Sequence, residues 1–277
     1  MYQNIEWWHS ELDDSGDHEG NLNSSLAEVN VTYGLTDAWN IAVDVITGTR
    51  TMDYYRAENI HHRDEDKPGI GDTRITLRYL FENTTFGPGQ RVFLGGGFVI
   101  PSSHTVTENP FALGKAGKKH THFDLSEGVK KGHVEVQYFN RSDGSVFPGG
   151  VLKIDVPLET NEHGFKPGIQ SSGALLLYFH TKSFWGGIPF FQILGQYRQP
   201  DIWDGAEAPN SGGSVLQVGG GLTFAVKDYV ITTSLRTPVY FKASVAGQEE
   251  KAVSNKTDVW GGSLSIRKSF TLIKFEE

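Results

Sequence analysis

The chain has 277 residues, a formal net charge of −8 and a mean hydropathy of −0.35. No apolar run approaches the ~20 residues that a membrane-spanning helix needs, so a helical membrane protein is excluded. The acidic balance leaves no basic face for nucleic acid, and the absence of cysteine excludes disulfides and thiolate metal sites. Abundant glycine and aromatic residues favour β structure with many turns, and we expect one domain spanning residues 1–277.

Apolar and polar residues alternate with a period of two in segment after segment, which is typical of strands with one dry and one wet face. In chain order the apolar rows are Val29, Val31 and Tyr33; Ile41, Val43 and Val45; Ile75, Leu77, Tyr79 and Phe81; Val134, Val136 and Tyr138; Leu152, Ile154, Val156 and Leu158; odd positions 229–241; and even positions 260–272. The last row is the clearest, because Leu264 and Ile266 flank Ser265. A strand between lipid and a wet lumen requires this pattern.

The links between these segments sort by length. Short turns are expected near Leu35–Asp37, Glu82–Gly87, Ser142–Ser145, Ser183–Gly187 and Lys227–Asp228. Longer links are expected at Glu11–Ser24, Thr51–Gly71, Ser102–Lys131, Glu159–Pro167, Pro200–Gly213 and Ala243–Lys256. Long and short alternate strictly, as in outer-membrane barrels with tight periplasmic turns and extended outer loops. The sequence therefore predicts an all-β fold, a transmembrane antiparallel up-and-down β-barrel of about 12 strands.

If the barrel prediction is correct, it also determines where three kinds of residue should lie: proline, glycine in triplets, and aromatic residues. Pro157, Pro189 and Pro238 remove ladder donors, so they should lie at strand ends or bulges. Gly95–Gly97 and Gly219–Gly221 should permit strand bending or close packing inside the barrel. Aromatic residues near strand ends would form interfacial belts in a barrel, or core and rim in a soluble sandwich; they include Trp39, Phe184, Trp185, Trp203 and Trp260.

Two short segments carry a family resemblance. Residues 67–81 read KPGIGDTRITLRYLF and are similar to a glycine-rich G-x-G-D start of a strand in outer-membrane transporters. Residues 122–128, which read HFDLSEG, are similar to a second feature of those proteins. Together they resemble the meta-pathway phenol-degradation or transporter-like family of Gram-negative outer-membrane barrels. The resemblance implies passive transport and carries over no catalytic residue.

Charged side chains on the polar faces point into the predicted lumen, where opposed charges would select small polar or charged solutes. The expected selectivity residues are Arg74, Arg78, Glu135, Lys153, Asp155, Arg198, Arg236 and Arg267. The alternative is that these charges pair across a filled interior. That alternative is serious because about 12 strands enclose less space than the roughly 16–18 strands of open porins.

Acidic residues and histidines gather in the outer links. The weak metal candidates are Asp13, Asp17, Glu19, His61, His62, His120 and His122. Alternating oxygen donors could hold Ca²⁺, and the histidine pairs could bind a transition metal if the links converge. No spacing is diagnostic, so solvated polar loops are the favoured interpretation, and no cofactor is expected.

An enzyme is not expected. Ser102 and Ser103 beside His104 supply the residue types of a lipid hydrolase, as does Ser10 beside His9. No G-x-S-x-G nucleophile elbow accompanies them, and neighbours in sequence do not make a catalytic triad.

The leading hypothesis is an outer-membrane channel for passive passage of small solutes through a lumen of mixed charge. The alternatives are a soluble β-sandwich binding module, and a plugged barrel that acts as a scaffold or adhesin through its outer loops. Expected partners are membrane lipid, lipopolysaccharide and a small-molecule solute. Residues 1–12 contain no basic stretch followed by an apolar one, so a secretory signal would already have been removed. Solute identity and oligomeric state stay open.

Overall fold

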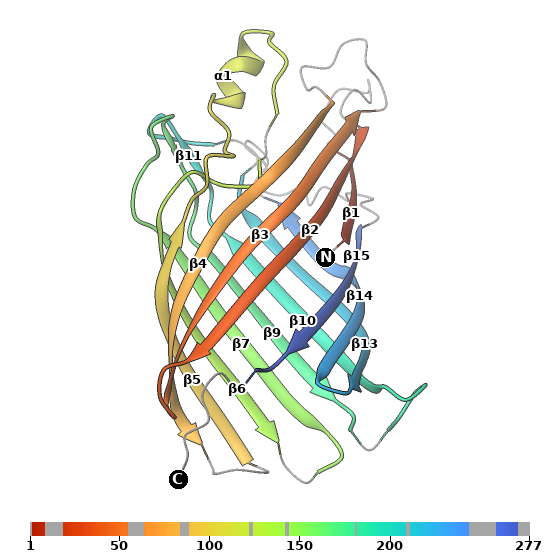
Figure 1. Ribbon diagram of the computed structural model, residues 1–277. Coiled ribbons are helices and arrows are strands. Elements are labelled where there is room, and N and C mark those ends of the chain that lie inside the picture. Colours follow the sequence, from red (N-terminus) through yellow and green to blue (C-terminus); the bar gives the residue numbers. More distant parts are fainter. Residues whose placement is uncertain are drawn as a thin grey trace.

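Twelve strands pair edge to edge into a closed antiparallel barrel in the computed structural model (Figure 1). The structure describes residues 2–8, 19–54, 64–83, 89–121, 124–141, 144–180, 182–208, 211–243 and 259–270. Strand β1 (Tyr2–Trp8) pairs with β15 (Val259–Lys268) and closes the ring. The ten strands between them are β2 (Glu19–Gly34), β3 (Trp39–Tyr54), β4 (Glu65–Asn83), β5 (Gly89–Ile100), β6 (Lys131–Arg141), β7 (Phe147–Pro157), β9 (Gln170–Tyr178), β10 (Ile188–Arg198), β13 (Gly213–Val226) and β14 (Tyr229–Ala243).

The links sort to the two ends of the barrel, which confirms the predicted up-and-down topology. The end that carries the long links we call the loop end, and the end that carries the short links the turn end. The helix α1 (Pro110–Lys115) lies at the loop end, and β15, the last strand, ends at the turn end (Figure 1). Strands β3 and β4 pair farther toward the loop end than predicted, because the ladder continues from Thr47–Ile70 to Met52–Glu65.

The outer face of the barrel is apolar. Leu264 and Ile266 on β15 are more than 60% exposed, as is Leu235 on the neighbouring β14. A protein in water rarely exposes continuous rows of large aliphatic side chains, whereas a lipid-facing wall requires them. The aliphatic rows face outward and no second sheet covers them within the described residues, so the alternative of a soluble β-sandwich is wrong.

The prolines lie where a ladder tolerates them. Pro157 is the last residue of β7, and Pro189 is the second residue of β10. Pro238 pairs with Gln217 at a β-bulge, where the register shifts after Leu216. The prediction of strand ends or bulges is therefore confirmed for all three.

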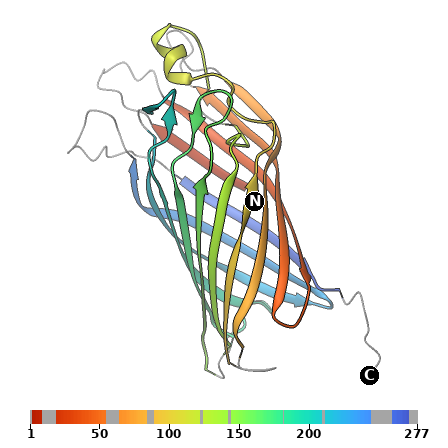
Figure 2. The same cartoon turned by 90° about the vertical axis from the view of Figure 1, so that its left-hand side faces the viewer.

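Three links fold into a structure at the loop end that we call the cap (Figure 2). Its described residues are 101–121, 124–130, 158–169, 199–208 and 211–212. The cap contains α1 and a small sheet of β8 (Phe165–Lys166), β11 (Ile202–Trp203) and β12 (Ala206–Glu207). Its buried core consists of Val129, Phe165, Trp203 and Ala208, with Val106 and Phe111 packed against it. Trp203 therefore belongs to the cap core rather than to an interfacial belt. No helix among the described residues is long and apolar enough to cross a membrane.

Gly97 on β5 lies where the backbone of β4 approaches closely, and a Cβ there would overlap the Ile75 carbonyl oxygen. Its neighbour Gly96 has room, since a Cβ would contact only the His133 carbonyl oxygen at 3.9 Å. We expect Gly97→Ala to destabilise the barrel by about 1–3 kcal/mol and Gly96→Ala by less than about 0.5 kcal/mol. The temperature at which the folded band disappears in semi-native gel electrophoresis measures this. Equal shifts in both variants would contradict the close approach.

Candidate functional site

Strands β4, β6 and β7 carry a set of paired charges on one side of the lumen, which we call the charged wall. Arg74 donates from Nη2 to Asp155 Oδ2 at 2.7 Å, and Arg78 donates from Nε to Glu135. His133 lies between the two carboxylates, with Nδ1 2.6 Å from Asp155 Oδ1 and Nε2 3.5 Å from Glu135 Oε2. Glu135 and His133 are almost completely buried. The predicted lumen charges here largely neutralise one another.

Glycine in the intervening strand makes this pairing possible. Gly95 on β5 pairs in register with Arg78 on one side and Glu135 on the other. A Cβ at Gly95 would lie 2.5 Å from the Glu135 Cγ atom. The missing side chain therefore leaves the space through which the two charges meet, as the interpretation of close packing at the glycine triplet expected.

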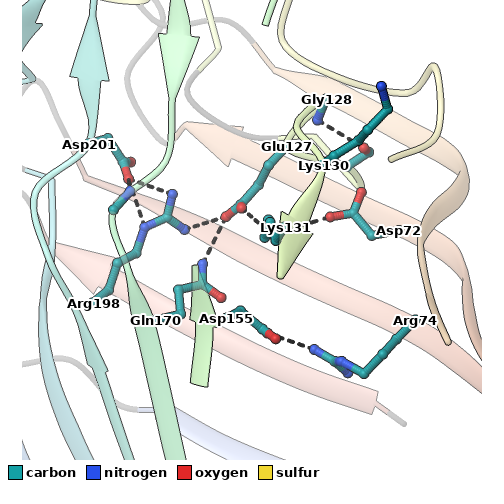
Figure 3. A network of polar contacts seen from close by, with 12 residues as sticks. Asp72, Arg74, Glu127, Gly128, Lys130, Lys131, Asp155, Gln170, Arg198 and Asp201 are labelled. Atoms are coloured by element: carbon teal, nitrogen blue, oxygen red, sulfur yellow. Dashed lines mark hydrogen bonds and ion pairs between the residues drawn. The ribbon is translucent and has the colours of Figure 1, made fainter. Parts of the chain in front are cut away.

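A second cluster ties the cap to the barrel (Figure 3). Glu127 is its centre, because it accepts hydrogen bonds from Arg198 Nη1 at 2.6 Å and Gln170 Nε2 at 2.9 Å, and pairs with Lys131. Arg198 also donates to Asp201 Oδ1 at 2.6 Å from Nη2. We call this cluster the Glu127 network; its members are Asp72, Glu127, Lys131, Gln170, Arg198 and Asp201.

The Glu127 carboxylate is held in its charged form. Burial alone would raise the pKa of Glu127, but Arg198 and Lys131 more than offset it and keep the pKa below its ordinary value. The charged carboxylate therefore persists into mildly acidic conditions and keeps the two cations paired.

The two sequence segments that carry the family resemblance meet at this seam. Lys67 Nζ lies 3.6 Å from Asp124 Oδ2, which joins the start of β4 to the cap. A Cβ at Gly71 would lie 2.9 Å from the Leu125 carbonyl oxygen, so glycine lets the cap backbone approach. Within the Glu127 network, Asp72 of the first segment and Glu127 of the second both pair with Lys131, and the distance from Lys131 Nζ to Asp72 Oδ2 is 3.4 Å. The segments form one joint between barrel and cap.

Residues that the structure describes line three cavities along the lumen. The outer cavity, about 220 Å³, lies beside the cap core, and its lining includes Phe111, Trp203, Glu127 and Arg198. The middle cavity, about 420 Å³, is lined mainly by polar residues, among them Arg74, Asp155, Ser172, Gln196, Arg198 and Ser214. Residues from β4 and β13 line the middle cavity, and these strands lie on opposite sides of the ring. Arg198 lines both cavities, so the Glu127 network is the partition between them.

The third cavity, about 520 Å³, lies at the turn end, and we call it the vestibule. Three arginines, Arg91, Arg141 and Arg267, line it. No aspartate or glutamate is among its lining residues in the part of the chain that the structure describes. Among the described residues, the charged side chains that line the vestibule are therefore all cationic.

The structure divides the eight predicted selectivity residues among these regions. Arg74, Arg78, Glu135 and Asp155 form the charged wall, and Lys153 is the cross-strand neighbour of Glu135. Arg198 belongs to the partition and Arg267 to the vestibule. Arg236 packs over glycine, since a Cβ at Gly261 would lie 3.0 Å from its Nε atom.

Sequence reasoning missed His133, Glu127 and Arg91. His133 has the weak signal of lying on the polar face of its predicted strand. Glu127 falls within the resembling segment 122–128, which gave no indication of its pairing. Arg91 had no signal, because its surroundings, Gln90–Phe93, do not alternate.

The metal hypothesis gains no site among the described residues, where no group of three or more potential ligands comes together. His120 is buried, with Nδ1 3.1 Å from the Lys118 carbonyl oxygen. The other candidates, Asp13, Asp17, His61, His62 and His122, lie outside the described residues, as does the side chain of Glu19.

In the Ser102–His104 segment, the Ser102 hydroxyl makes hydrogen bonds within the loop. Ser102 Oγ donates to the Ile70 carbonyl oxygen, and accepts the backbone N–H of His104 at 3.2 Å. These bonds fix the start of the cap link against β4. The pair Ser10 and His9 lies outside the described residues.

No family model matches this chain, and no curated protein matches it in sequence. Among solved structures it is similar to an outer-membrane channel from Pseudomonas putida F1. The TM-score is 0.62 at 9% sequence identity, over 96% of this chain and 93% of that one. The specific phenol-degradation family stays a prediction. At this identity the likeness concerns the fold, and the chain has the β-barrel architecture of that outer-membrane channel.

Proposed function

We propose that this protein is a passive outer-membrane channel for small polar or charged solutes. The observation that carries the proposal is a closed barrel with an apolar outer face and three cavities along a polar lumen. The fold it shares with a bacterial outer-membrane channel supports the same conclusion. Membership of the meta-pathway family would narrow this proposal to a channel for aromatic solutes.

The outer surface supports insertion in a membrane. Exposed aromatic residues lie near both ends of the strands. Near the turn end the rings of Trp39 and Tyr79 pack in a tilted arrangement with centroids 4.8 Å apart, and Trp260 lies near the loop end. Phe184 and Trp185 extend the group at the turn end. Such residues anchor barrels at the two membrane interfaces, with the aliphatic rows between them.

The lumen supports passage along one side. The charged wall occupies β4 to β7, whereas β13 to β15 present several small residues to the interior beside Arg236 and Arg267. Gly219 and Gly221 lie on β13, and Ser234 on β14 shares a hydrogen bond of 2.7 Å with Ser263 on β15. Solutes would therefore move past hydroxyl groups while facing neutralised ion pairs on the other side.

The absence of native cysteine allows a direct test of passage. Ser172 on β9 lines the middle cavity, and Leu175 on the same strand is 61% exposed on the outer face. In planar bilayers, a charged methanethiosulfonate reagent should lower the conductance of Ser172→Cys by roughly half or more, because the adduct narrows the lumen. Leu175→Cys should keep its conductance.

The outcomes separate the proposal from its alternatives. Unmodified conductance in Ser172→Cys, with labelling shown by mass spectrometry, would place the pathway elsewhere. Complete absence of conductance in inserted wild-type protein would reject the channel and favour a plugged scaffold. The cap and its partition are the observation that makes this second function worth testing.

A further inference from the structure

The vestibule combines cations from opposite sides of the lumen. Arg141 lies at the end of β6, and Arg267 lies on β15. Five strands separate β6 from β15 in either direction around the ring, so these two arginines face each other across the barrel. Arg91 on β5 adds a third guanidinium beside the β6 side. Like charges converging on one cavity raise the local potential and attract an anion.

The rest of the lining is aromatic, aliphatic and hydroxylic. Phe139, Phe147 and Tyr178 come from β6, β7 and β9. On the other side, Thr223 and Thr232 share a hydrogen bond of 3.1 Å in the same cavity. Rings and hydroxyl groups beside guanidinium groups suit a ligand with a flat apolar body and one anionic head.

We propose that the vestibule binds small aromatic carboxylates and makes the channel prefer anionic solutes. This inference rests on the proposed channel function for its transport part, but not for its binding part. The carboxylate would receive paired N–H donors from an arginine, and the ring would lie against the aromatic side chains. A bare inorganic anion would use the cations alone and leave the apolar lining in contact with water. The cavity of about 520 Å³ is within the usual size range of small-molecule sites.

Binding is tested on purified protein in detergent by calorimetric titration with benzoate. Acetate supplies the charge without the ring, and benzyl alcohol supplies the ring without the charge. We expect benzoate to bind at least about tenfold more tightly than either. Acetate or benzyl alcohol binding as tightly as benzoate would overturn the assignment of an aromatic carboxylate.

Two variants assign the site. Arg267→Gln should weaken benzoate binding roughly ten- to a hundred-fold, because a charged hydrogen-bond donor is lost. Lys268→Gln is the matched control, since Lys268 is the next residue on β15 and its Nζ lies 3.4 Å from the Tyr229 hydroxyl outside the vestibule. The control should bind as wild type. If Arg267→Gln fails to fold, Arg141→Gln replaces it in this test, because Arg141 lies at an exposed strand end. Arg141→Gln should also weaken benzoate binding. Unchanged binding in a folded arginine variant would overturn the site.

Reversal potentials in a salt gradient test the transport part. A wild-type channel should favour chloride over potassium, and Arg267→Gln should reduce this preference while Lys268→Gln keeps it. Conductance without anion preference would overturn the selectivity inference and leave the channel intact. Benzoate binding in detergent without any conductance would reject the channel and leave the site intact.

Discussion

Replacing Glu135 by alanine is expected to destabilise the barrel by about 3 kcal/mol or more, because it leaves a buried guanidinium without its carboxylate. The Glu135 side chain is 1% exposed and that of its partner Arg78 only 12%. The same carboxylate also accepts a hydrogen bond from Gln137 Nε2 at 2.9 Å and faces His133. Two hydrogen-bond donors, Arg78 and Gln137, therefore lose their acceptor in one substitution.

Urea-induced unfolding in lipid vesicles, followed by tryptophan fluorescence, measures this loss. The double variant Arg78→Ala/Glu135→Ala should recover part of the stability, because no uncompensated charge remains. Val136→Ala, on the outer face of the same strand, is the control and should cost about 1 kcal/mol or less. If Glu135→Ala is as stable as wild type, water already solvates the charged wall and the Arg78–Glu135 pair is not buried as the structure has it.

Replacing Glu127 by glutamine is expected to open the partition between the outer and middle cavities and to raise conductance severalfold. Arg198 and Lys131 would lose the carboxylate that holds them together. Because Glu127 and Arg198 are 21% and 31% exposed, water compensates in part, and we expect a cost of about 2 kcal/mol in cap docking. Single-channel recordings and limited proteolysis of residues 101–130 measure the two effects.

Glu159→Gln is the matched control for the cap. Glu159 pairs with Lys130 at 3.8 Å and is 43% exposed, so the pair contributes little and conductance should not change. A rise in both variants would show that any loss of acidic charge at the loop end raises conductance, without a specific partition.

Acid offers an independent check on Glu127. Since its pKa in the folded cap is lower than in the unfolded chain, its stabilising contribution is complete above the unfolded pKa. This contribution is lost as pH falls through the lower, folded pKa. Conductance should therefore rise on acidification below the ordinary range of glutamate in wild type, whereas Glu127→Gln should lack this step. The same acid step in both would assign it to another group.

Much of the fold follows from local sequence. A period of two places Leu264 and Ile266 on one face and Ser263 and Ser265 on the other, whatever the strand pairs with. Strict alternation of link lengths restricts the topology to neighbouring antiparallel strands. Proline positions follow from the loss of a ladder donor, which is why Pro157, Pro189 and Pro238 lie at strand ends and a bulge.

Which lumen charges pair with one another could be learned only from the tertiary structure. The alternation indicated that Arg78 and Glu135 point inward, yet 57 residues separate them and β5 lies between. Their contact depends on the curvature of the closed ring and on the missing side chain of Gly95. The sequence left open whether the lumen charges pair with one another or stay available to solutes. In the structure the charges of the charged wall are paired, whereas at the vestibule cations converge from opposite sides of the barrel.

The sequence by itself determined which face of each strand is apolar and which end of the barrel carries the long links, because both are properties of short segments. Only the tertiary structure decided that the links form a cap around Phe165 and Trp203, that Glu127 joins it to the barrel, and that Arg141 faces Arg267. These are contacts between residues far apart in the chain, and ring closure and strand stagger set their distances.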